Sequence, residues 1–332
     1  MINRLELKNF TAFDELLMDF SPGVNLIIGE NGTGKTHILK LLYAILSSLK
    51  EDKKISEKLI SIFLPKDDRI GRLVRRKKGS SECRIKVIGN HQNYCSFRFS
   101  NHTKKEMFIP SMMWMLDDIR STVFIPVKEM LSHSPGFLSL YKEREIHFDE
   151  TYPDIISKAF LPPRRDKTKY LAMIQKVIDG KIVVKDDKFF LKNKQGELEF
   201  DLLAEGMRKL GLLWLLINNG AIADSTSTLF WDEPETNLNP SMFETLVKVL
   251  LNLQRNGVQI FIATHCYVFL KEFDVQKKST DAVRFFSLRP DKETSHITVT
   301  GGDDYLSIVP NPITDAYSRL YDEEIKRSIG RS

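Results

Sequence analysis

The sequence predicts an α/β protein with a parallel core sheet, an antiparallel β subdomain and an inserted helical lobe. Its last third alternates apolar strand-like runs at 227–231, 258–264 and 282–288 with helical patterns at 241–254 and 266–272. That alternation is typical of a parallel sheet with crossover helices. Alternating apolar and polar residues at 84–88 and 94–99 indicate half-exposed antiparallel strands. The interval from 128 to 178 is mostly helical in pattern, with interruptions at prolines.

The remaining elements follow in chain order. Strands are expected at 2–8, 16–20 and 24–28, with Pro22-Gly23 as a turn, and a helix at 37–49. Residues 51–80 are rich in lysine and arginine and show no clear period, whereas 121–125 is typical of a buried strand. Short strands at 181–184 and 188–191, a helix at 203–218, a small hairpin near 297–305 and a final helix at 313–328 complete the prediction. We expect three parts, at 1–127, 128–180 and 181–332.

Composition sets broad limits on location and partners. A chain of 332 residues with 42% hydrophobic content can bury the core of one large domain or two, and a net charge of +5 permits an anionic partner without requiring one. Cys83, Cys95 and Cys266 form neither a metal-ligand pattern nor a disulfide framework. The longest apolar stretch, Leu210 to Ile217, is too short for a bilayer, and the N-terminus lacks an apolar signal core. We therefore expect a cytoplasmic protein without a membrane partner.

Residues 29–36 match the phosphate-binding pattern G-x-x-x-x-G-K-[ST]. The candidate nucleotide-binding residues are Gly29, Glu30, Asn31, Gly32, Thr33, Gly34, Lys35 and Thr36. Lys35 would neutralise phosphate charge and Thr36 would place a hydroxyl on Mg²⁺. The alternative is a flexible glycine-rich turn, but an apolar strand before the loop and a helix after it favour a site for ATP.

Two further segments supply the groups that hydrolysis needs. The apolar run Thr228–Trp231 ends in Asp232 and Glu233, and ligands in such sheets bind beyond the carboxyl ends of strands. Asp232 would complete the Mg²⁺ site, while Glu233 would deprotonate the attacking water. His265 follows the next strand and would sense the γ-phosphate. For Asp232 and Glu233 the alternative is an exposed acidic loop, and for His265 it is a capping or core histidine.

These motifs, with the long interval between Lys35 and Asp232, resemble the ABC-type ATPase superfamily. The branch that fits includes SMC and RecF proteins and the ATPase domains of OLD-like enzymes, and the resemblance rests on residues 5–10, residues 232–240 and His265. It implies an ABC-type ATPase head that hydrolyses ATP to ADP and phosphate with Mg²⁺. Two sets of roles come with it: Lys8 and Asn9 near the nucleotide, and a D-loop of Asn237, Leu238 and Asn239 across a dimer interface.

The resemblance also implies a signature loop that caps the partner's nucleotide. Residues 203–209, with Ala204, Glu205 and Gly206 at the helix start, match best, although Ala204 and Glu205 replace the usual serine and glycine. A missing hydroxyl removes a hydrogen bond to a charged group, worth about 1.5–3 kcal/mol. Gly206→Asp is expected to spare ATP affinity and impair turnover. No glutamine stands in the Q-loop region, which holds Lys128 and Glu129.

Basic and methionine-rich segments leave alternatives open. The clusters Arg69, Arg72, Arg75, Arg76, Lys77, Lys78 and Arg164, Arg165, Lys167, Lys169 suit nucleic acid, a protein partner or a solvated surface. The run 112–115, Met-Met-Trp-Met, favours core over an adaptable interaction surface.

The leading hypothesis is a regulatory ATPase that oligomerises with nucleotide, as a two-fold dimer or a larger assembly of dimers. It would control a separately encoded effector, such as a nuclease, because the residues after 288 leave no room for a nuclease domain. Residues 124–131 and 148–152 resemble stand-alone ATPases of bacterial antiphage defence operons, whose trigger would be nucleic acid or a phage protein. The alternatives are a RecF-type DNA-repair or replication ATPase that binds duplex DNA and, more weakly, the motor of a transporter.

Overall fold

The central sheet places the three nucleotide motifs side by side. Its order is β14-β13-β3-β12-β11-β7, and all pairs are parallel except β13 with β14. The phosphate loop follows β3, His265 follows β12 and Asp232 ends β11. Because β12 lies between β3 and β11, all three motifs meet at the carboxyl edge of adjacent strands.

The computed structural model describes residues 1–115, 118–143, 146–164, 169–291, 294, 296–309 and 311–329. Its strands are β1 Ile2–Phe10, β2 Phe13–Asp19, β3 Val24–Gly29, β4 Glu82–Gly89, β5 Tyr94–Ser100, β6 Phe108–Met113, β7 Ser121–Ile125, β8 Lys181–Lys185, β9 Lys188–Lys192, β10 Glu197–Glu199, β11 Ser227–Asp232, β12 Gln259–Thr264, β13 Val283–Pro290 and β14 Ile297–Gly302. Its helices are α1 Lys35–Glu51, α2 Ile55–Phe63, α3 Phe137–Glu143, α4 Thr151–Ala159, α5 Lys169–Ile178, α6 Glu205–Asn218, α7 Phe243–Arg255, α8 Tyr267–Gln276 and α9 Pro312–Ile329.

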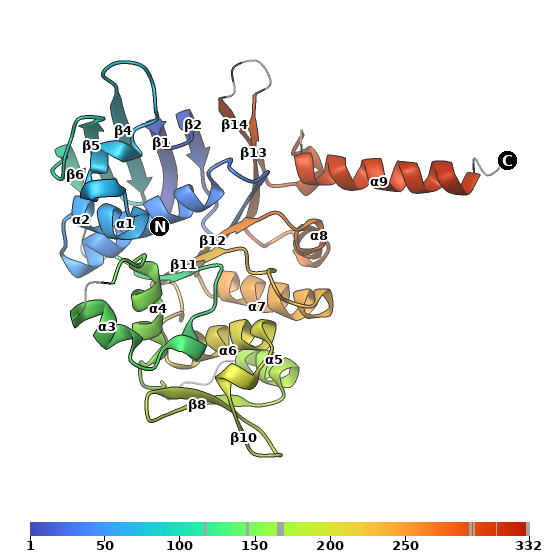
Figure 1. Cartoon of the computed structure of the whole chain (residues 1–332). Helices are drawn as coiled ribbons and strands as arrows, with labels where there is room; N and C mark the ends of the chain where they lie inside the picture. The colour runs from blue at the N-terminus through green and yellow to red at the C-terminus, as the bar shows by residue number, and fades with distance from the viewer. Residues whose placement is uncertain are drawn as a thin grey trace.

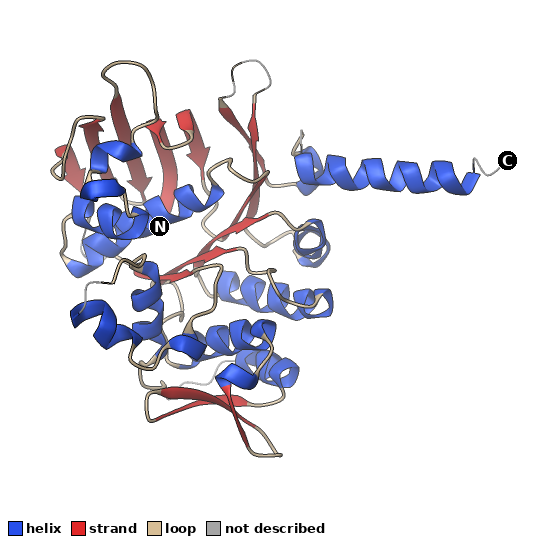
Figure 2. Cartoon of the chain, in the orientation of Figure 1, coloured by secondary structure: helices blue, strands red, loops and turns tan. Residues whose placement is uncertain are grey.

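The central strands are apolar on both faces because each face covers a separate core. Leu26 and Ile28 of β3 contribute to one cluster, whereas Ile27 contributes to the other. Helices α5, α6 and α7 lie on one side of the sheet, and α1 with the antiparallel sheet lies on the other (Figures 1 and 2). Burial on both faces explains the near-continuous apolar runs of the parallel strands. The predicted α/β architecture is confirmed.

The antiparallel subdomain is a five-stranded sheet in the order β2-β1-β4-β5-β6. The edge strand β6 corrects the expectation that residues 112–115 are core. Met112, Met113 and Met115 are 40% to 51% exposed, and only Trp114 packs against the core. Among the described residues β6 pairs with β5 alone, so no described strand covers its outer side.

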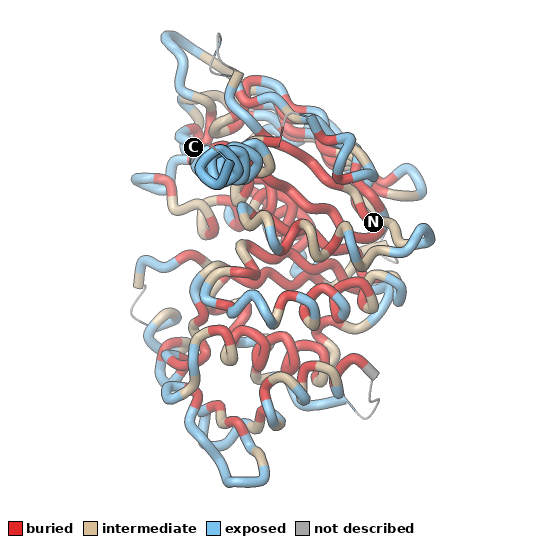
Figure 3. Tube along the Cα trace, turned by 90° about the vertical axis from the view of Figure 1, so that its right-hand side faces the viewer, coloured by how far each residue is buried: buried red, intermediate tan, exposed pale blue. Residues whose placement is uncertain are grey.

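Three other segments differ from the sequence-based prediction. Residues 55–63 form α2, whose apolar side packs against α1 although its surroundings are basic. β14 pairs with β13, so residues 297–305 are the second half of a longer hairpin and not a hairpin by themselves. β2 begins at Phe13 and not at residue 16. The final helix is confirmed as α9, which extends from the body with only Ile313 buried (Figures 1 and 3).

Polar contacts attach the helical segment after β7 to the first two helices. Lys58 of α2 is 1% exposed, and its ammonium lies 2.8 Å from Asp154 and 3.0 Å from Glu150. The Tyr43 hydroxyl of α1 donates to Asp154 at 2.7 Å. These contacts compensate for burying a charge.

The division of the chain at 128 and 180 stays a prediction. In the described part of the chain, no helix has both the length and the apolar character that crossing a membrane requires.

Candidate nucleotide site

The phosphate loop bends between β3 and α1 through two glycines in left-handed conformations. Gly32 has φ 82° and Gly34 has φ 92°. A Cβ on Gly34 would lie 2.6 Å from the ring of Phe13, so the turn between β1 and β2 packs directly against the loop. Glycine is required at Gly34 for both conformation and space. The first backbone N–H groups of α1 then point toward the loop, as an anion site needs.

Lys35 is folded over its own loop. It is 7% exposed, and its ammonium donates to the carbonyl oxygens of Gly29 at 2.8 Å and Glu30 at 3.0 Å. Burial lowers the pKa of Lys35, while the carboxylates of Glu233 and Asp232 oppose that shift. A phosphate bound in the loop would offer this ammonium a charged acceptor in place of carbonyl oxygens.

Thr36 and Asp232 meet at the position predicted for the metal. The Thr36 hydroxyl lies 2.9 and 3.0 Å from the two carboxylate oxygens of Asp232. Asp232 is 4% exposed, and burial raises its pKa to about 6, against the opposing hydrogen bond from Thr36. A hydroxyl and a carboxylate are the donors that loop-bound Mg²⁺ uses, so the pair fits this ion. No group of three or more His, Cys, Asp or Glu side chains gathers as a metal site in the described residues.

Glu233 and His265 lie in contact. Glu233 has a left-handed backbone with φ 47°. One of its carboxylate oxygens lies 3.3 Å from Nδ1 of His265, and the other accepts from the hydroxyl of Thr236 at 3.1 Å. Both side chains are partly exposed. The arrangement orients a carboxylate that can take a proton from water.

Sequence reasoning missed Glu235. This buried carboxylate accepts from the Thr264 hydroxyl at 2.6 Å and from the backbone N–H of His265 at 3.2 Å. Burial raises the pKa of Glu235. It joins the turn after β11 to the end of β12 and so positions His265 beside Glu233. Its place within the motif at 232–240, two residues after Glu233, is a sequence signal that could have identified it.

Lys8 and Asn9 make contacts within the antiparallel sheet. Lys8 is exposed and lies 3.0 Å from Glu15 across β1 and β2. Asn9 donates its amide to the Glu82 carbonyl at 3.0 Å. The residues that reach the phosphate loop from this side are Ala12 and Phe13. A contact of Lys8 or Asn9 with nucleotide stays a prediction.

The signature segment packs against the D-loop of its own subunit. The Glu205 carboxylate accepts from the Asn237 amide at 2.7 Å. Gly206 is buried, and a Cβ there would lie 2.6 Å from the Asn237 carbonyl oxygen and 3.2 Å from Leu238. The expectation for Gly206→Asp therefore needs correction, because the new side chain would also displace its own D-loop. Ala204 is exposed, with an extended backbone before α6 and no side-chain cap.

The D-loop itself is fixed by local contacts. Asn237 has φ 62° and Leu238 is buried. The Asn239 side chain accepts from the backbone N–H of Ser241 at 3.0 Å and caps the short turn that precedes α7. Reach of this loop to a second subunit remains a prediction.

Glu129 occupies the Q-loop region as a buried residue, whereas Lys128 is exposed. The Glu129 carboxylate lies 3.1 Å from Nε of Arg208 on α6 and accepts from the Ser132 hydroxyl at 3.2 Å. Burial raises the pKa of Glu129. The segment after β7 is thereby attached to the signature helix and not to the metal pair.

The first basic cluster divides into paired and exposed residues. Arg75 lies 3.0 Å from Asp14, and Lys77 pairs with the same carboxylate. Arg72, Arg76 and Lys78 are exposed, and a hollow of about 320 Å³ lies among Arg72, Arg75, Arg76 and Lys77. In the second cluster Arg165, Lys167 and the side chain of Lys169 lie outside the described residues.

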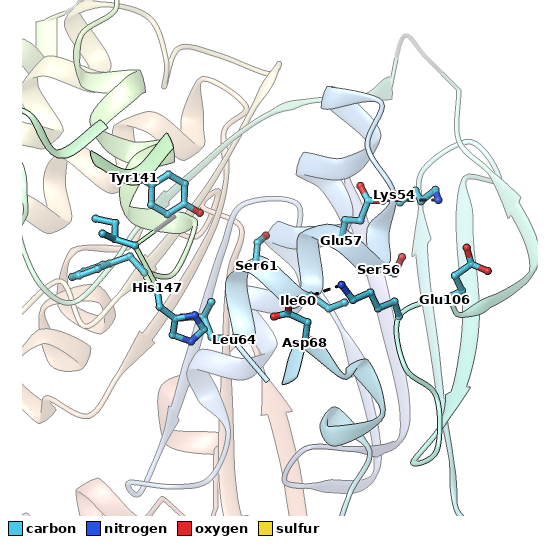
Figure 4. Close-up of a pocket in the computed structure, with 13 residues that line it drawn as sticks. Lys54, Ser56, Glu57, Ile60, Ser61, Leu64, Asp68, Glu106, Tyr141 and His147 are labelled. Carbon is cyan, nitrogen blue, oxygen red and sulfur yellow. Dashed lines mark ion pairs between the residues drawn. The ribbon is translucent and has the colours of Figure 1, made fainter. Parts of the chain in front are cut away.

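Another hollow lies apart from the phosphate loop. It measures about 580 Å³ and lies between α2 on one side and Tyr141 and residues 146–148 on the other, and Asp68 and Glu106 also line it (Figure 4). Lys54, Glu57 and His147 give it mixed charge. Its lining includes neither the phosphate loop nor the acidic end of β11.

Known families match both halves of the site. A family model described as "AAA ATPase domain" matches residues 1–110, and one described as "AAA domain, putative AbiEii toxin, Type IV TA system" matches residues 133–271. The two halves of the chain thus each match a model of an AAA-type ATPase family. Its fold is similar to an Smc head bound to the C-winged helix domain of ScpA, with a TM-score of 0.59, 13% identity, and coverage of 92% of this chain and 98% of that one. An Smc head with an extended coiled coil, bound to the C-terminal domain of ScpA derived from Pyrococcus furiosus, gives a TM-score of 0.53 at 12% identity, covering 97% and 99%.

The chain is also similar to curated DNA replication and repair proteins RecF. The protein of Carboxydothermus hydrogenoformans is 52% identical over 42 residues, which are 13% of this chain and 12% of that protein. The protein of Lactococcus lactis is 22% identical over 202 residues, which are 58% and 54%. The matched segments thus span about half or less of these relatives.

Proposed function

We propose that this chain is a regulatory ATPase whose ATP-bound two-fold pair controls a separately encoded effector, in antiphage defence. The observation that carries this is the position of the signature segment. Ala204 is exposed at the start of α6, while Glu205 and Gly206 contact their own D-loop. A helix N-terminus left open in this way suits a phosphate supplied by a second copy.

The proposed reaction uses residues of one subunit for binding and proton transfer. Lys35 and the N-terminus of α1 bind the phosphates, and Thr36 and Asp232 hold Mg²⁺, which neutralises phosphate charge when bound. Glu233 accepts the proton of the attacking water, oriented by Thr236 and His265 at the distances given above. The N-terminus of α6 from the second copy closes the site.

The link to defence rests on similarity. The description of the family model that matches residues 133–271 names a toxin and a toxin–antitoxin system. In addition, residues 124–131 and 148–152 resemble stand-alone defence ATPases. Such an ATPase would hold or release its effector, for example a nuclease, according to its bound nucleotide.

Mixing two inactive variants tests the shared site. Ala204→Asp should add a cap to α6, because aspartate is a good N-cap, but its charge would repel the partner's γ-phosphate. Lys35→Ala removes phosphate binding. Each variant alone should be inactive, whereas their mixture should recover turnover, because one site in each mixed pair contains neither defect. Inactivity of the mixture, together with a monomeric wild type in sedimentation with ATP, would exclude the shared site.

A second candidate function is duplex DNA binding of the RecF type. The similarity to RecF proteins and the exposed Arg72, Arg76 and Lys78 favour it. Fluorescence anisotropy with duplex DNA at physiological salt distinguishes the two functions. The DNA hypothesis expects binding that weakens steeply with salt and is lost when the three residues are changed to alanine. The effector hypothesis expects the adjacent gene product to co-purify.

A further inference from the structure

A buried lysine lies between the signature helix and the turn that carries Glu233. Lys209 of α6 is 1% exposed. Its ammonium donates to the Thr236 carbonyl at 2.8 Å and reaches the Glu233 carbonyl at 3.4 Å. Within the described residues it forms no ion pair. A buried ammonium held only by carbonyl oxygens is costly and depends on those bonds.

The turn that Lys209 holds has an unfavourable backbone. Glu233 and Asn237 are both non-glycine residues in the left-handed region, at φ 47° and 62°. Such conformations are unfavourable for residues other than glycine and persist only where the surroundings enforce them. The internal bond from the Thr236 N–H to the Glu233 carbonyl, at 3.2 Å, is one constraint, and the Lys209 ammonium is another.

About one helical turn before Lys209, α6 also contacts Asn237, at the other end of the segment that begins with Glu233. Glu205 accepts from Asn237, and Gly206 packs against the Asn237 carbonyl. A displacement of the N-terminus of α6 is therefore passed to the turn from Glu233 to Asn237 by contacts at both ends.

We propose that Lys209 is a positioning residue that holds the backbone of Glu233 in register with the signature helix of the same subunit. The inference deepens the proposed function and rests on it in one respect, which is that α6 meets the partner's γ-phosphate. A shift of α6 on contact with the partner's nucleotide would then be passed to the base of this subunit, so the two sites of a pair are coupled through Lys209.

The pair formed by mixing Ala204→Asp and Lys35→Ala subunits can show in which subunit Lys209 acts on turnover. Its only working site combines the phosphate loop and Glu233 of the Ala204→Asp subunit with the signature segment of the Lys35→Ala subunit. Lys209→Met added to the Ala204→Asp subunit should lower turnover about tenfold or more, since small misplacements of a catalytic group have large effects. Added to the Lys35→Ala subunit, it should change turnover by no more than about twofold. Equal losses in the two positions, or none in either, would overturn the proposal.

Three comparisons separate positioning from a general loss of stability. Lys58→Met also removes a buried ammonium, but from the contacts between α2 and the helical lobe. It should lower the melting temperature without the fall in kcat. Lys209→Arg, which can donate to both carbonyls, should restore part of the lost kcat. If Lys209→Met does not fold, Lys209→Gln takes its place, and wild-type kcat in that variant counts against the proposal.

Failure of the shared site gives a different result. If the mixture lacks activity before Lys209 is changed and the wild type sediments as a monomer with ATP, the composite site is wrong. The homogeneous Lys209→Met protein then decides the positioning role. A lower kcat with ATP affinity within about threefold of wild type supports it, and an unchanged kcat refutes it.

Discussion

The two halves of the nucleotide site differ in how completely one subunit builds them. The phosphate half brings together Lys35 and Thr36, which follow β3, with Asp232 and Glu233 at the end of β11, on the two sides of β12 in one sheet, and the Thr36–Asp232 contact is already formed. The signature half begins at an exposed, uncapped Ala204, and its next residues contact the D-loop. A rigid sheet organises the first half. The second half offers the N-terminus of α6, which has no side-chain cap, and under the proposed function a second copy would complete it.

Lys35→Ala probes the phosphate half and should have the largest effect. The substitution removes charged hydrogen bonds to two phosphates, each worth about 1.5–3 kcal/mol, so ATP affinity should fall at least about a hundredfold and turnover should vanish. Calorimetry with Mg²⁺ and ATP on the folded variant measures this. Lys50→Ala, at the exposed end of α1, is the control. Undiminished affinity would remove the phosphate loop from the site.

Glu233→Gln separates binding from chemistry within the same half. The amide keeps the size of the side chain but cannot take a proton from water, so turnover should fall about 10²- to 10⁴-fold while ATP stays bound. A phosphate-release assay and an ATP-binding measurement on one preparation check both expectations. Glu244→Gln, on the exposed face of α7, should behave as wild type. Turnover within a few-fold of wild type would shift the role to another residue.

The sequence predicted the phosphate half better than the signature half, for a physical reason. Gly34, Lys35 and Asp232 act through backbone geometry and strand order, which local patterns encode. The contacts of Glu205 with Asn237 and of Lys209 with Thr236 join segments about thirty positions apart, and no local pattern encodes them. Met112 was misjudged similarly, because apolar character does not reveal that β6 is an edge strand. Glu129 was noticed, but its partner Arg208 was not.

Asp232→Asn tests how much the buried, ionised carboxylate of Asp232 lowers the free energy of unfolding. Folding raises the pKa of Asp232 from 3.8 to about 6, so the stabilising contribution of the protonated form is complete below pH 3.8 and is lost as the pH rises through 6. At pH 7.5 the ionised carboxylate costs on the order of 2–3 kcal/mol. The asparagine variant should exceed wild type by that amount in urea unfolding without nucleotide or metal, and the gap should close toward pH 4. The exposed Asp201→Asn is the control, and a gap that does not change with pH would contradict the assignment.

Ala204→Ser probes the signature half, with the smallest effect. A serine at this extended position before α6 should cap the helix, which stabilises a protein by about 1 kcal/mol. Its hydroxyl would also face the partner's γ-phosphate, so ATP-driven association should tighten about tenfold. Ala204→Asp is the matched comparison, because it supplies the same cap and a repelling charge. If the two halves differ as argued, serine and aspartate should raise the melting temperature alike and move the sedimentation of the ATP-bound pair in opposite directions. The same association with both side chains would mean that the N-terminus of α6 does not meet the nucleotide of a second copy.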